Sequence, residues 1–541
     1  MSNLIPKNVI PKNEPVLGYE PGSMWREVLK KRIDELKSQR IEIPLIIGGK
    51  EVKTGIMGKS IMPQEHKHVL AEYHKAGKEE AKLAIETALE AKETWNELSF
   101  TDRISIFRKA ADLLSTKWRC TLNAATMLGQ SKSAHQAEID SACELADFLR
   151  FNSYNALRIY EEQPVQAPGG WNEIEYRPLE GFIFAITPFN FTAIGGNLPT
   201  APAIMGNVVV WKPASTAVYS SYFIMKLLQE AGLPDGVINF IPGNSAEIGE
   251  TVLSHPELAG VHFTGSTEVF QTIWETVGKN IRNYRTYPRL VGETGGKDFV
   301  VAHESADVKS LVFSLMRGAF EYQGQKCSAT SRAYIPESMW PEVENELIKN
   351  LKRVKVGPVE DFSNFMNAVI DKSSFEKIKG YIKIARESKD AKIVFGGGCD
   401  DSTGYFVEPT VILTSDPNFI TMREEIFGPV LTIYLYDDFE KVLDLCDKTS
   451  PYGLTGSIFA RDRKAIALAK KVLVNAAGNF YINDKTTGSV VGQNPFGGSR
   501  ASGTNDKVGS SVNLLRWVSL RSIKENYLPL EDFEYPFMKE V

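Results

Sequence analysis

The chain has 541 residues, a formal net charge of -5, 10% aromatic residues and 24% charged residues, which is typical of an ordinary soluble globular protein. At about 100–200 residues per domain, this length predicts two to four domains with cores that need no disulfide or metal. The slight excess of acidic residues argues against a nucleic-acid-binding protein, which normally carries a basic patch.

The cysteines and histidines exclude further classes. The five cysteines include no C-x-x-C pair, and the seven histidines include no H-E-x-x-H motif. This usage predicts a reducing compartment, no disulfide framework and no metal site. No apolar run approaches the 18 residues of a membrane span.

The N-terminal region predicts an extended arm followed by helices. Residues 1–22 are interrupted by prolines and resemble neither a secretory signal nor a mitochondrial presequence. A charged helix is expected over residues 25–40 and a short strand from Ile41. Helical spacing of apolar residues then predicts three helices, over residues 79–98, 102–116 and 137–158.

A Pro-Gly-Gly turn interrupts two short extended pieces between Gln163 and Arg177. This pattern predicts a β-hairpin or a connector, and the segment is a reasonable place for a contact between subunits.

From Gly181 short apolar strands alternate with helices. The expected strands are FIFAI, NVVVW, VINFI and VHF, and one intervening helix covers residues 219–231. This alternation predicts a parallel sheet with helices on both faces, which binds nucleotides at the carboxyl ends of its strands. Neither G-x-G-x-x-G nor a P-loop motif is present, so other residues must hold a nucleotide. Lys212 and the turn at residues 263–267 lie at strand ends, although a solvated lysine and an ordinary helix cap explain them equally well.

A second α/β block is expected after Gly296. Its helices are predicted near residues 308–322, 341–352 and 463–474, and its first strand includes RAYI. The glycine- and serine-rich segment over residues 492–510 is either a flexible loop or a binding loop.

Three stretches carry candidate catalytic groups. Cys327 lies among small and polar residues, which suits a nucleophile that a substrate must reach, although an inert thiol is the usual interpretation of one cysteine. Glu293 precedes a Gly-Gly pair, and Asn190 lies in ITPFNF. A nucleophile, a carboxylate and an amide donor would together form a site.

Six motifs in order resemble the aldehyde dehydrogenase superfamily. They are PFN, WKP, FTGS, ETGGK, GQKC and EEIFGPV. The resemblance implies an α/β fold with a Rossmann-type NAD-binding domain, an α/β catalytic domain and a β-hairpin/C-terminal oligomerisation element. The implied division is an arm and helix over 1–40, an NAD-binding domain over 41–160 and 181–293, a catalytic domain over 294–485, and oligomerisation elements over 161–180 and 505–541.

The resemblance also implies a mechanism. Cys327 would attack the aldehyde carbon, and the Asn190 amide with the Cys327 backbone N–H would hold the oxyanion. NAD would accept the hydride, and Glu293 would activate the water that hydrolyses the thioester. The matching cofactor-binding residues are Thr187, Lys212, Gly265, Ser266, Thr267, Glu268, Val269, Glu425 and Phe427. Many NAD-preferring relatives carry a glutamate where this chain has Ser215, which leaves NADP use open.

Within the superfamily, TPFNFTAIGGN, FEYQGQKCSA and the segment from GNFYIND to LRW resemble the subfamily that oxidises L-glutamate 5-semialdehyde to L-glutamate, the second step of proline degradation. The implied substrate-binding residues are Ser328, Gly488, Ser489, Phe191 and Phe496. A succinate semialdehyde dehydrogenase and a non-catalytic family member are the alternatives. The first is disfavoured by the Gly488–Ser489 turn, and the second by the presence of all three catalytic residues.

The resemblance implies a homodimer or a larger homo-oligomer. No proline dehydrogenase sequence precedes the site, so a separate proline dehydrogenase is expected to supply the substrate. Eukaryotic members of the subfamily work in the mitochondrial matrix, whereas the N-terminal sequence leaves the cytoplasm as an alternative.

Overall fold

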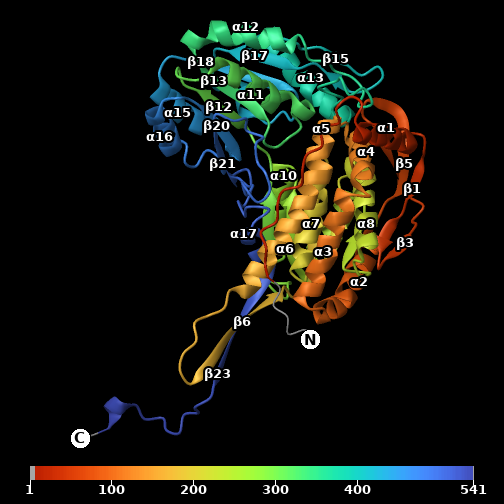
Figure 1. Ribbon diagram of the computed structural model, residues 1–541, viewed down its shortest axis with the longest axis vertical. Helices are drawn as coiled ribbons and strands as arrows, with labels where there is room; N and C mark the ends of the chain where they lie inside the picture. Colours follow the sequence, from red (N-terminus) through yellow and green to blue (C-terminus); the bar gives the residue numbers. More distant parts are fainter. Residues whose placement is uncertain (1–6, 540–541) are drawn as a thin grey trace.

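Two seven-stranded sheets, each covered by helices, form the centre of the structure (Figure 1). The computed structural model describes residues 7–539. No helix within this range is both long enough and apolar enough to cross a membrane.

The first sheet has the strand order β11-β10-β7-β8-β9-β2-β3. Its strands are β2 (Leu45–Ile47), β3 (Lys50–Val52), β7 (Phe182–Ile186), β8 (Val209–Lys212), β9 (Ile238–Phe240), β10 (Leu258–Thr264) and β11 (Arg289–Glu293). The strands β7 to β11 are parallel, and their apolar runs are buried, as in a sheet covered on both faces. The four strands expected from the alternating pattern are confirmed.

The order of the first sheet reverses at β7. The chain proceeds from β7 through β8 to β9 on one side and returns to β10 and β11 on the other. Ligands of open α/β sheets bind at the carboxyl ends of strands beside such a reversal. Residues 187–190 after β7 and residues 265–267 after β10 therefore lie where a nucleotide is expected.

Long helices cover this sheet, and one of them differs from expectation. The helices of the first unit are α2 (Lys78–Glu97), α3 (Phe100–Ser115), α4 (Arg119–Gln130), α6 (Leu145–Glu161), α7 (Thr192–Ile204), α8 (Val218–Ala231), α9 (Ser245–Leu253) and α10 (Thr267–Lys279). The single helix expected over residues 137–158 is α5 (Ala134–Ala137), a π-helical turn η1 (Glu138–Glu144) and then α6. The π-helical turn buries Glu138 and Asp140, whose partners are described below.

The second sheet has the order β14-β17-β18-β13-β12-β20-β21. Its strands are β12 (Asp298–Ala302), β13 (Thr330–Pro336), β14 (Ala391–Phe395), β17 (Thr410–Thr414), β18 (Val430–Tyr436), β20 (Thr455–Phe459) and β21 (Asn479–Ile482). Only β14 runs antiparallel to its neighbour. The surrounding helices are α11 (Val308–Phe320), α12 (Trp340–Leu351), α13 (Lys372–Glu387), α14 (Ile420–Arg423), α15 (Phe439–Lys448) and α16 (Arg463–Val472).

A long two-stranded ribbon projects from the body of the molecule (Figure 1). It pairs β6 (Gly170–Pro178) with β23 (Val518–Asn526) in antiparallel register along nine residues of each strand. Of the two expectations for residues 163–177, a hairpin or a connector, the local hairpin is wrong, because the partner strand of β6 comes from near the C-terminus. Local turn residues cannot reveal a partner so distant in sequence.

The N-terminal segment packs against the first unit. The helix α1 (Met24–Lys37) buries Leu29, Ile33 and Leu36 on one face, and β1 (Ile41–Ile43), β4 (Met57–Met62) and β5 (Glu65–His74) form a small sheet. Short elements complete the chain: β15 (Cys399–Asp400), β16 (Phe406–Val407), β19 (Tyr452–Gly453), β22 (Ser499–Arg500) and α17 (Ser511–Leu515).

Candidate active site

Asn190 lies between the carboxyl end of β7 and the first turn of α7. Asp140 fixes this turn, because its two carboxylate oxygens accept hydrogen bonds from the Thr192 and Ala193 backbone N–H groups at 3.0 and 2.8 Å. A carboxylate at a helix N-terminus is favoured by the unpaired N–H groups and by the helix dipole. The π-helical turn thereby sets the position of the Asn190 loop.

A buried lysine completes this arrangement. The Lys132 Nζ lies 2.7 Å from the Asp140 carboxylate, and neither side chain is exposed. The same Nζ lies 4.2 Å from the ring centroid of Phe191 and 4.3 Å from that of Tyr322. Lys132 therefore links the loop that carries Asn190 to the segment that leads to Cys327, although no motif in the sequence singles it out.

Cys327 follows α11 and a short turn η3 (Glu321–Gly324) in which three successive residues have left-handed backbone angles. Tyr322 and Gln323 have φ values of 54° and 55°, which non-glycine residues adopt at a cost in free energy. The Gln323 side chain offsets this cost with three hydrogen bonds, to Ser131 O, to Ala368 O and from Asn367 N. The turn is thus rigid and directs the chain toward Cys327.

The Gly295–Gly296 pair lets the chain after β11 pass close to Cys327. A Cβ on Gly296 would lie 2.1 Å from the Cys327 carbonyl oxygen, and a Cβ on Gly295 would lie 2.5 Å from Glu425 Oε2. Only glycine allows this approach. The glycine pair therefore brings Glu293, at the end of β11, and Glu425 to the cysteine segment.

The site strongly favours neutral side chains. Burial raises the pKa of the Glu293 carboxyl to about 8, and its Oε1 has no hydrogen-bond partner within residues 7–539. Burial, followed by the nearby Glu293, Asp298 and Glu425 carboxylates, raises the pKa of the Cys327 thiol well above its ordinary value. Burial and these like charges therefore favour the thiol over the thiolate in the protein alone.

Two hydrogen-bond donors at this point have no carbonyl acceptor among the described residues. The buried Asn190 side-chain amide makes no recorded hydrogen bond to the described part of the chain, and the Cys327 backbone N–H donates to no carbonyl there. Free donors beside a nucleophile are the arrangement that stabilises an oxyanion.

The residues expected to hold a dinucleotide lie at the ends of β7, β8 and β10 and across from them on the second unit. Thr187 accepts a hydrogen bond from Trp211 Nε1 at 3.0 Å. The Lys212 Nζ is buried, its one recorded partner is the Pro213 carbonyl at 3.3 Å, and burial lowers its pKa to about 8. A buried amine with one weak acceptor is suited to hydroxyl groups of a ligand.

The turn after β10 begins α10. The Ser266 hydroxyl caps this helix by accepting from the Val269 N–H at 3.3 Å, and Gly265 precedes it with no side chain to block the helix N-terminus. Thr267 Oγ1 contacts the Gly295 N–H, whereas Glu268 and Val269 lie exposed in the first turn. An open helix N-terminus is an anion-binding feature.

Glu425 and Phe427 approach from the second unit. One Glu425 oxygen accepts a hydrogen bond from the Gly296 N–H at 2.9 Å, so this carboxylate is held beside the glycine pair. Phe427 has a left-handed backbone, and its ring packs edge-on against Phe189, with 5.7 Å between the centroids. The two units thus meet at the candidate site.

The expected substrate-binding residues occupy two segments near the cysteine. The Ser328 carbonyl accepts a hydrogen bond from Thr486 Oγ1 at 2.6 Å, which ties the residue after Cys327 to the turn that contains Gly488 and Ser489. The backbone N–H groups of Gly488 and Ser489 donate no hydrogen bond within residues 7–539. Phe496 is anchored by reciprocal backbone hydrogen bonds with Val508 at 3.2 and 2.8 Å. Backbone hydrogen bonds therefore hold the glycine-rich segment at this point.

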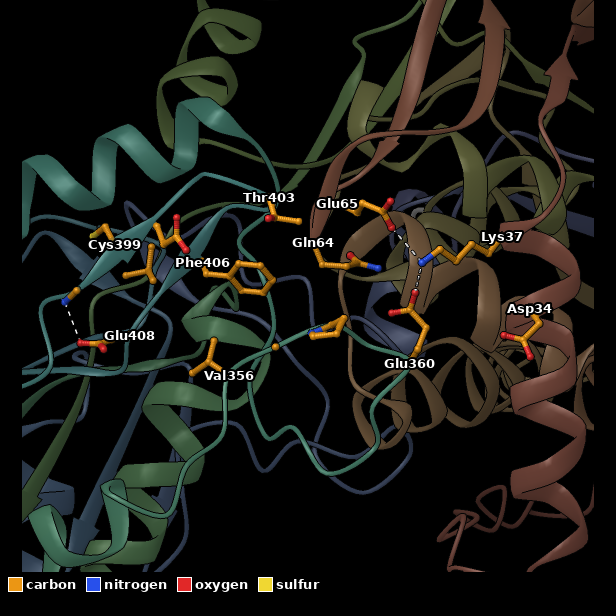
Figure 2. A pocket seen from close by; sticks show the side chains of 15 residues that line it. Asp34, Lys37, Gln64, Glu65, Val356, Glu360, Cys399, Thr403, Phe406 and Glu408 are labelled. Carbon is orange, nitrogen blue, oxygen red and sulfur yellow. Dashed lines mark hydrogen bonds and ion pairs between the residues drawn. The ribbon is translucent and has the colours of Figure 1, made fainter.

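The open cleft in Figure 2 lies elsewhere. It has a volume of about 970 Å³ and lies between α1 and the second unit, where Lys37 bridges Glu65 and Glu360 at 3.0 and 2.7 Å. None of its lining residues belongs to the candidate site. Its carboxylates and lysine join α1 and β5 to the second unit.

Comparisons with known proteins find relatives over nearly the whole chain. The family model described as "Aldehyde dehydrogenase family" matches residues 53–523. A delta-1-pyrroline-5-carboxylate dehydrogenase of Dictyostelium discoideum, named as mitochondrial, is 56% identical and covers 99% of this chain and 98% of its own. The human protein of the same name is 50% identical over 97% of this chain and 94% of its own. The crystal structure of the Mycobacterium tuberculosis delta-pyrroline-5-carboxylate dehydrogenase bound with NAD superimposes with a TM-score of 0.96 at 49% identity, over 100% of both chains.

Proposed function

The chain belongs to the aldehyde dehydrogenase family, and from this premise we propose that it is an NAD-dependent dehydrogenase that oxidises L-glutamate 5-semialdehyde, formed from 1-pyrroline-5-carboxylate, to L-glutamate. The observation that carries the proposal is the likeness at about half identity, over nearly the whole chain, to proteins named for this activity. The geometry around Cys327 supplies the groups that the reaction needs.

Cys327 is the nucleophile of this mechanism. Its thiol gives its proton to water, and its sulfur forms a bond to the aldehyde carbon while the carbonyl π bond opens, which places a negative charge on the aldehyde oxygen. The Asn190 amide and the Cys327 N–H are the two free donors for that oxygen, and a donor of this kind is worth about 3–4 kcal/mol in the transition state. When bound, NAD supplies the acceptor for the hydride that leaves the carbon, and a thioester remains on Cys327.

The residues of the first unit suit the cofactor. The weakly bonded Lys212 amine and the open N-terminus of α10 at Gly265 and Ser266 would hold the adenosine ribose and the pyrophosphate. Glu425 and Phe427, which face them from the second unit, would hold the nicotinamide ribose and pack beside it. Thr187, Thr267, Glu268 and Val269 would complete the binding surface.

Glu293 acts as the general base of the second half-reaction. Its carboxylate takes a proton from water, the water oxygen attacks the thioester carbon, and the bond to the Cys327 sulfur breaks to release the acid. A carboxyl group with a pKa of about 8 is a stronger base than an ordinary glutamate once it is ionised. Its unpaired Oε1 leaves room for the hydrogen bond to that water.

The substrate carboxylate has a matching set of donors. The free N–H groups of Gly488 and Ser489, with the Ser328 hydroxyl, suit a carboxylate at the far end of a five-carbon aldehyde, whereas the Ser489 hydroxyl already donates to Asn494 O at 2.7 Å. Phe191 and Phe496 would flank the aliphatic part. Succinate semialdehyde also carries a carboxylate but is one carbon shorter and lacks the amine, so we expect a site suited to the longer aldehyde to bind it less well.

Assembly and location complete the proposal. The ribbon and the tail beyond it expose large apolar side chains, among them Leu528, Leu530, Phe533 and Phe537, each with 71% or more of its surface accessible. Such an exposed apolar segment supports a homodimer or larger homo-oligomer in which the ribbon and tail pack on a second copy. Relatives named as mitochondrial support the mitochondrial matrix, where a separate proline dehydrogenase would supply the substrate.

The test is NAD reduction by the purified protein with three aldehydes: glutamate semialdehyde, succinate semialdehyde and a simple alkyl aldehyde. The proposal predicts a kcat/KM for glutamate semialdehyde that exceeds the other two by about 100-fold or more, because hydrogen-bonding sites discriminate strongly against substrates that leave them unpaired. Equal kcat/KM values for the three aldehydes would support dehydrogenase activity but contradict the proposed substrate. If the protein turned over none of them, a non-catalytic family member would be supported instead.

A further inference from the structure

The N-terminal arm, residues 7–22, precedes the residues that the family model matches and yet reaches the substrate side of the site. In Figure 1 the red N-terminal trace runs along the helices of the first unit before α1 begins. The arm contains two asparagines whose side chains contact the body of the protein, Asn8 and Asn13. Only Asn13 touches the loop that carries Ser489.

Asn13 uses both ends of its side-chain amide. Its Nδ2 donates to Asp147 Oδ2 at 2.7 Å and to the Val491 carbonyl oxygen at 2.8 Å. Its Oδ1 accepts a hydrogen bond from Gln493 Nε2 at 2.8 Å. One side chain thus joins α6, the arm and the loop over residues 488–494, which are separated by more than 130 and 470 residues in sequence.

The arm is fixed firmly enough to act as a support. The Glu14 N–H donates to Asp147 Oδ1 at 2.8 Å, and the Glu14 carboxylate bridges Arg119 and Arg150 at 2.6 Å each. Further along, Leu17 N and the Tyr19 hydroxyl donate to the buried Glu138 carboxylate at 2.8 and 2.7 Å. Hydrogen bonds to charged groups at these distances are among the stronger ones in proteins.

The loop over residues 488–494 has few supports of its own. The Ser489 hydroxyl donates to Asn494 O at 2.7 Å, and two backbone hydrogen bonds to Val490 O close the turn. These bonds shape the loop internally. The Val491 side chain is buried in the core of the first unit, and Asn13 is the donor to the Val491 carbonyl within residues 7–539, so the arm adds a polar anchor to this apolar one.

We propose that Asn13 is a positioning residue for substrate specificity, which holds the 488–494 loop so that the Gly488 and Ser489 N–H groups face the carboxylate of the substrate. This inference rests on the proposed function. A displacement of about 1 Å in such donors is enough to lose most of their contribution to binding. Cys327, Asn190 and Glu293 make no hydrogen bond to residues 7–22, so the chemical step itself should be spared.

The test compares Asn13→Ala with Asn8→Ala as the matched control. Asn8 lies on the same arm, and its Nδ2 donates to Tyr154 O at 3.1 Å without touching the loop. Asn13→Ala is expected to raise KM for glutamate semialdehyde about tenfold, with little change in kcat. A tenfold change corresponds to the loss of one or two hydrogen bonds. It should leave kcat/KM for a simple alkyl aldehyde and KM for NAD unchanged, and Asn8→Ala should change none of these.

A second variant distinguishes the loss of the contact with the loop from a general disturbance of the arm. Gln493→Met removes the loop's own bond to Asn13 while leaving the arm intact, so it should raise the same KM, and the double variant should be no worse than Asn13→Ala. Equal losses with both aldehydes would show a purely structural role and overturn the inference. A wild-type preference for glutamate semialdehyde that survives in both variants would overturn this inference alone, whereas a wild type without that preference would overturn the proposed function with it.

Discussion

The Lys132–Asp140 pair gives the most demanding test of how the site is held. Lys132→Met removes the ammonium group and keeps an apolar stem of similar length. The Asp140 carboxylate would then be buried without its cation, and the Phe191 and Tyr322 rings would lose the charge that lies about 4 Å from each.

The expected loss of stability follows from burial. Removing one partner of a buried ion pair costs about 3–5 kcal/mol, and Asp140 retains its two backbone N–H donors, so the lower end is expected. With an unfolding entropy of about 2.1 cal/mol/K per residue, a cooperative transition of this 541-residue chain would shift by about 3–4 °C. Because the pair also holds the Asn190 loop, kcat should fall about tenfold or more.

Thermal unfolding by calorimetry and NAD reduction would measure the two effects. The matched control is Lys226→Met, since Lys226 also lies over an aromatic ring, 5.8 Å from the centroid of Tyr222, but is partly exposed. The double variant Lys132→Met/Asp140→Asn should recover most of the lost stability, because it removes the uncompensated charge. A double variant less stable than Lys132→Met would refute the reasoning, as would a loss of stability equal to that of the control.

The other expectations concern the chemistry. With a pKa of about 8, the ionised fraction of Glu293 rises about tenfold from pH 7 to pH 9, so hydrolysis of the Cys327 thioester should rise with pH and be lost as pH falls below 8. An activated ester that acylates Cys327 in a burst would report this step without cofactor, and Glu293→Gln should abolish the pH dependence. Gly296→Ala would place a Cβ 2.1 Å from Cys327 O and should lower kcat roughly 100-fold, while NAD binding followed by fluorescence changes little. Lys212→Met should raise KM for NAD about tenfold at nearly constant kcat, and an unchanged KM would remove Lys212 from the cofactor site. Cys327→Ser should lower dehydrogenase activity more than about a thousandfold. Full activity of this variant would contradict the role of Cys327 as nucleophile.

Much of the fold could be predicted because apolar periodicity is a local property. The strands β7 to β10 and helices such as α2, α3 and α8 follow from alternating runs that any parallel sheet with covering helices requires. The end of α8 at Gly232, which has a φ of 96°, follows from the need for a left-handed residue.

The candidate site was predictable only in part. The catalytic and binding residues could be named from motifs whose order resembles a known family, but their surroundings could not. The π-helical turn at Glu138–Glu144 buries charged residues that a helical pattern places on a surface. Lys132 and Asn13 gain their roles from partners that only the folded chain brings near, and no local rule identifies such partners.

The ribbon of β6 and β23 has a consequence for synthesis on the ribosome. The first sheet can be completed once β11 has been made, whereas β6 remains unpaired until residues 518–526 emerge, about 340 residues later. At roughly 5–20 residues per second this delay is about 20–70 s. During that interval a nascent chain with a nearly complete first unit exposes an open strand edge, which is a site for chaperone binding or for mispairing with neighbouring chains.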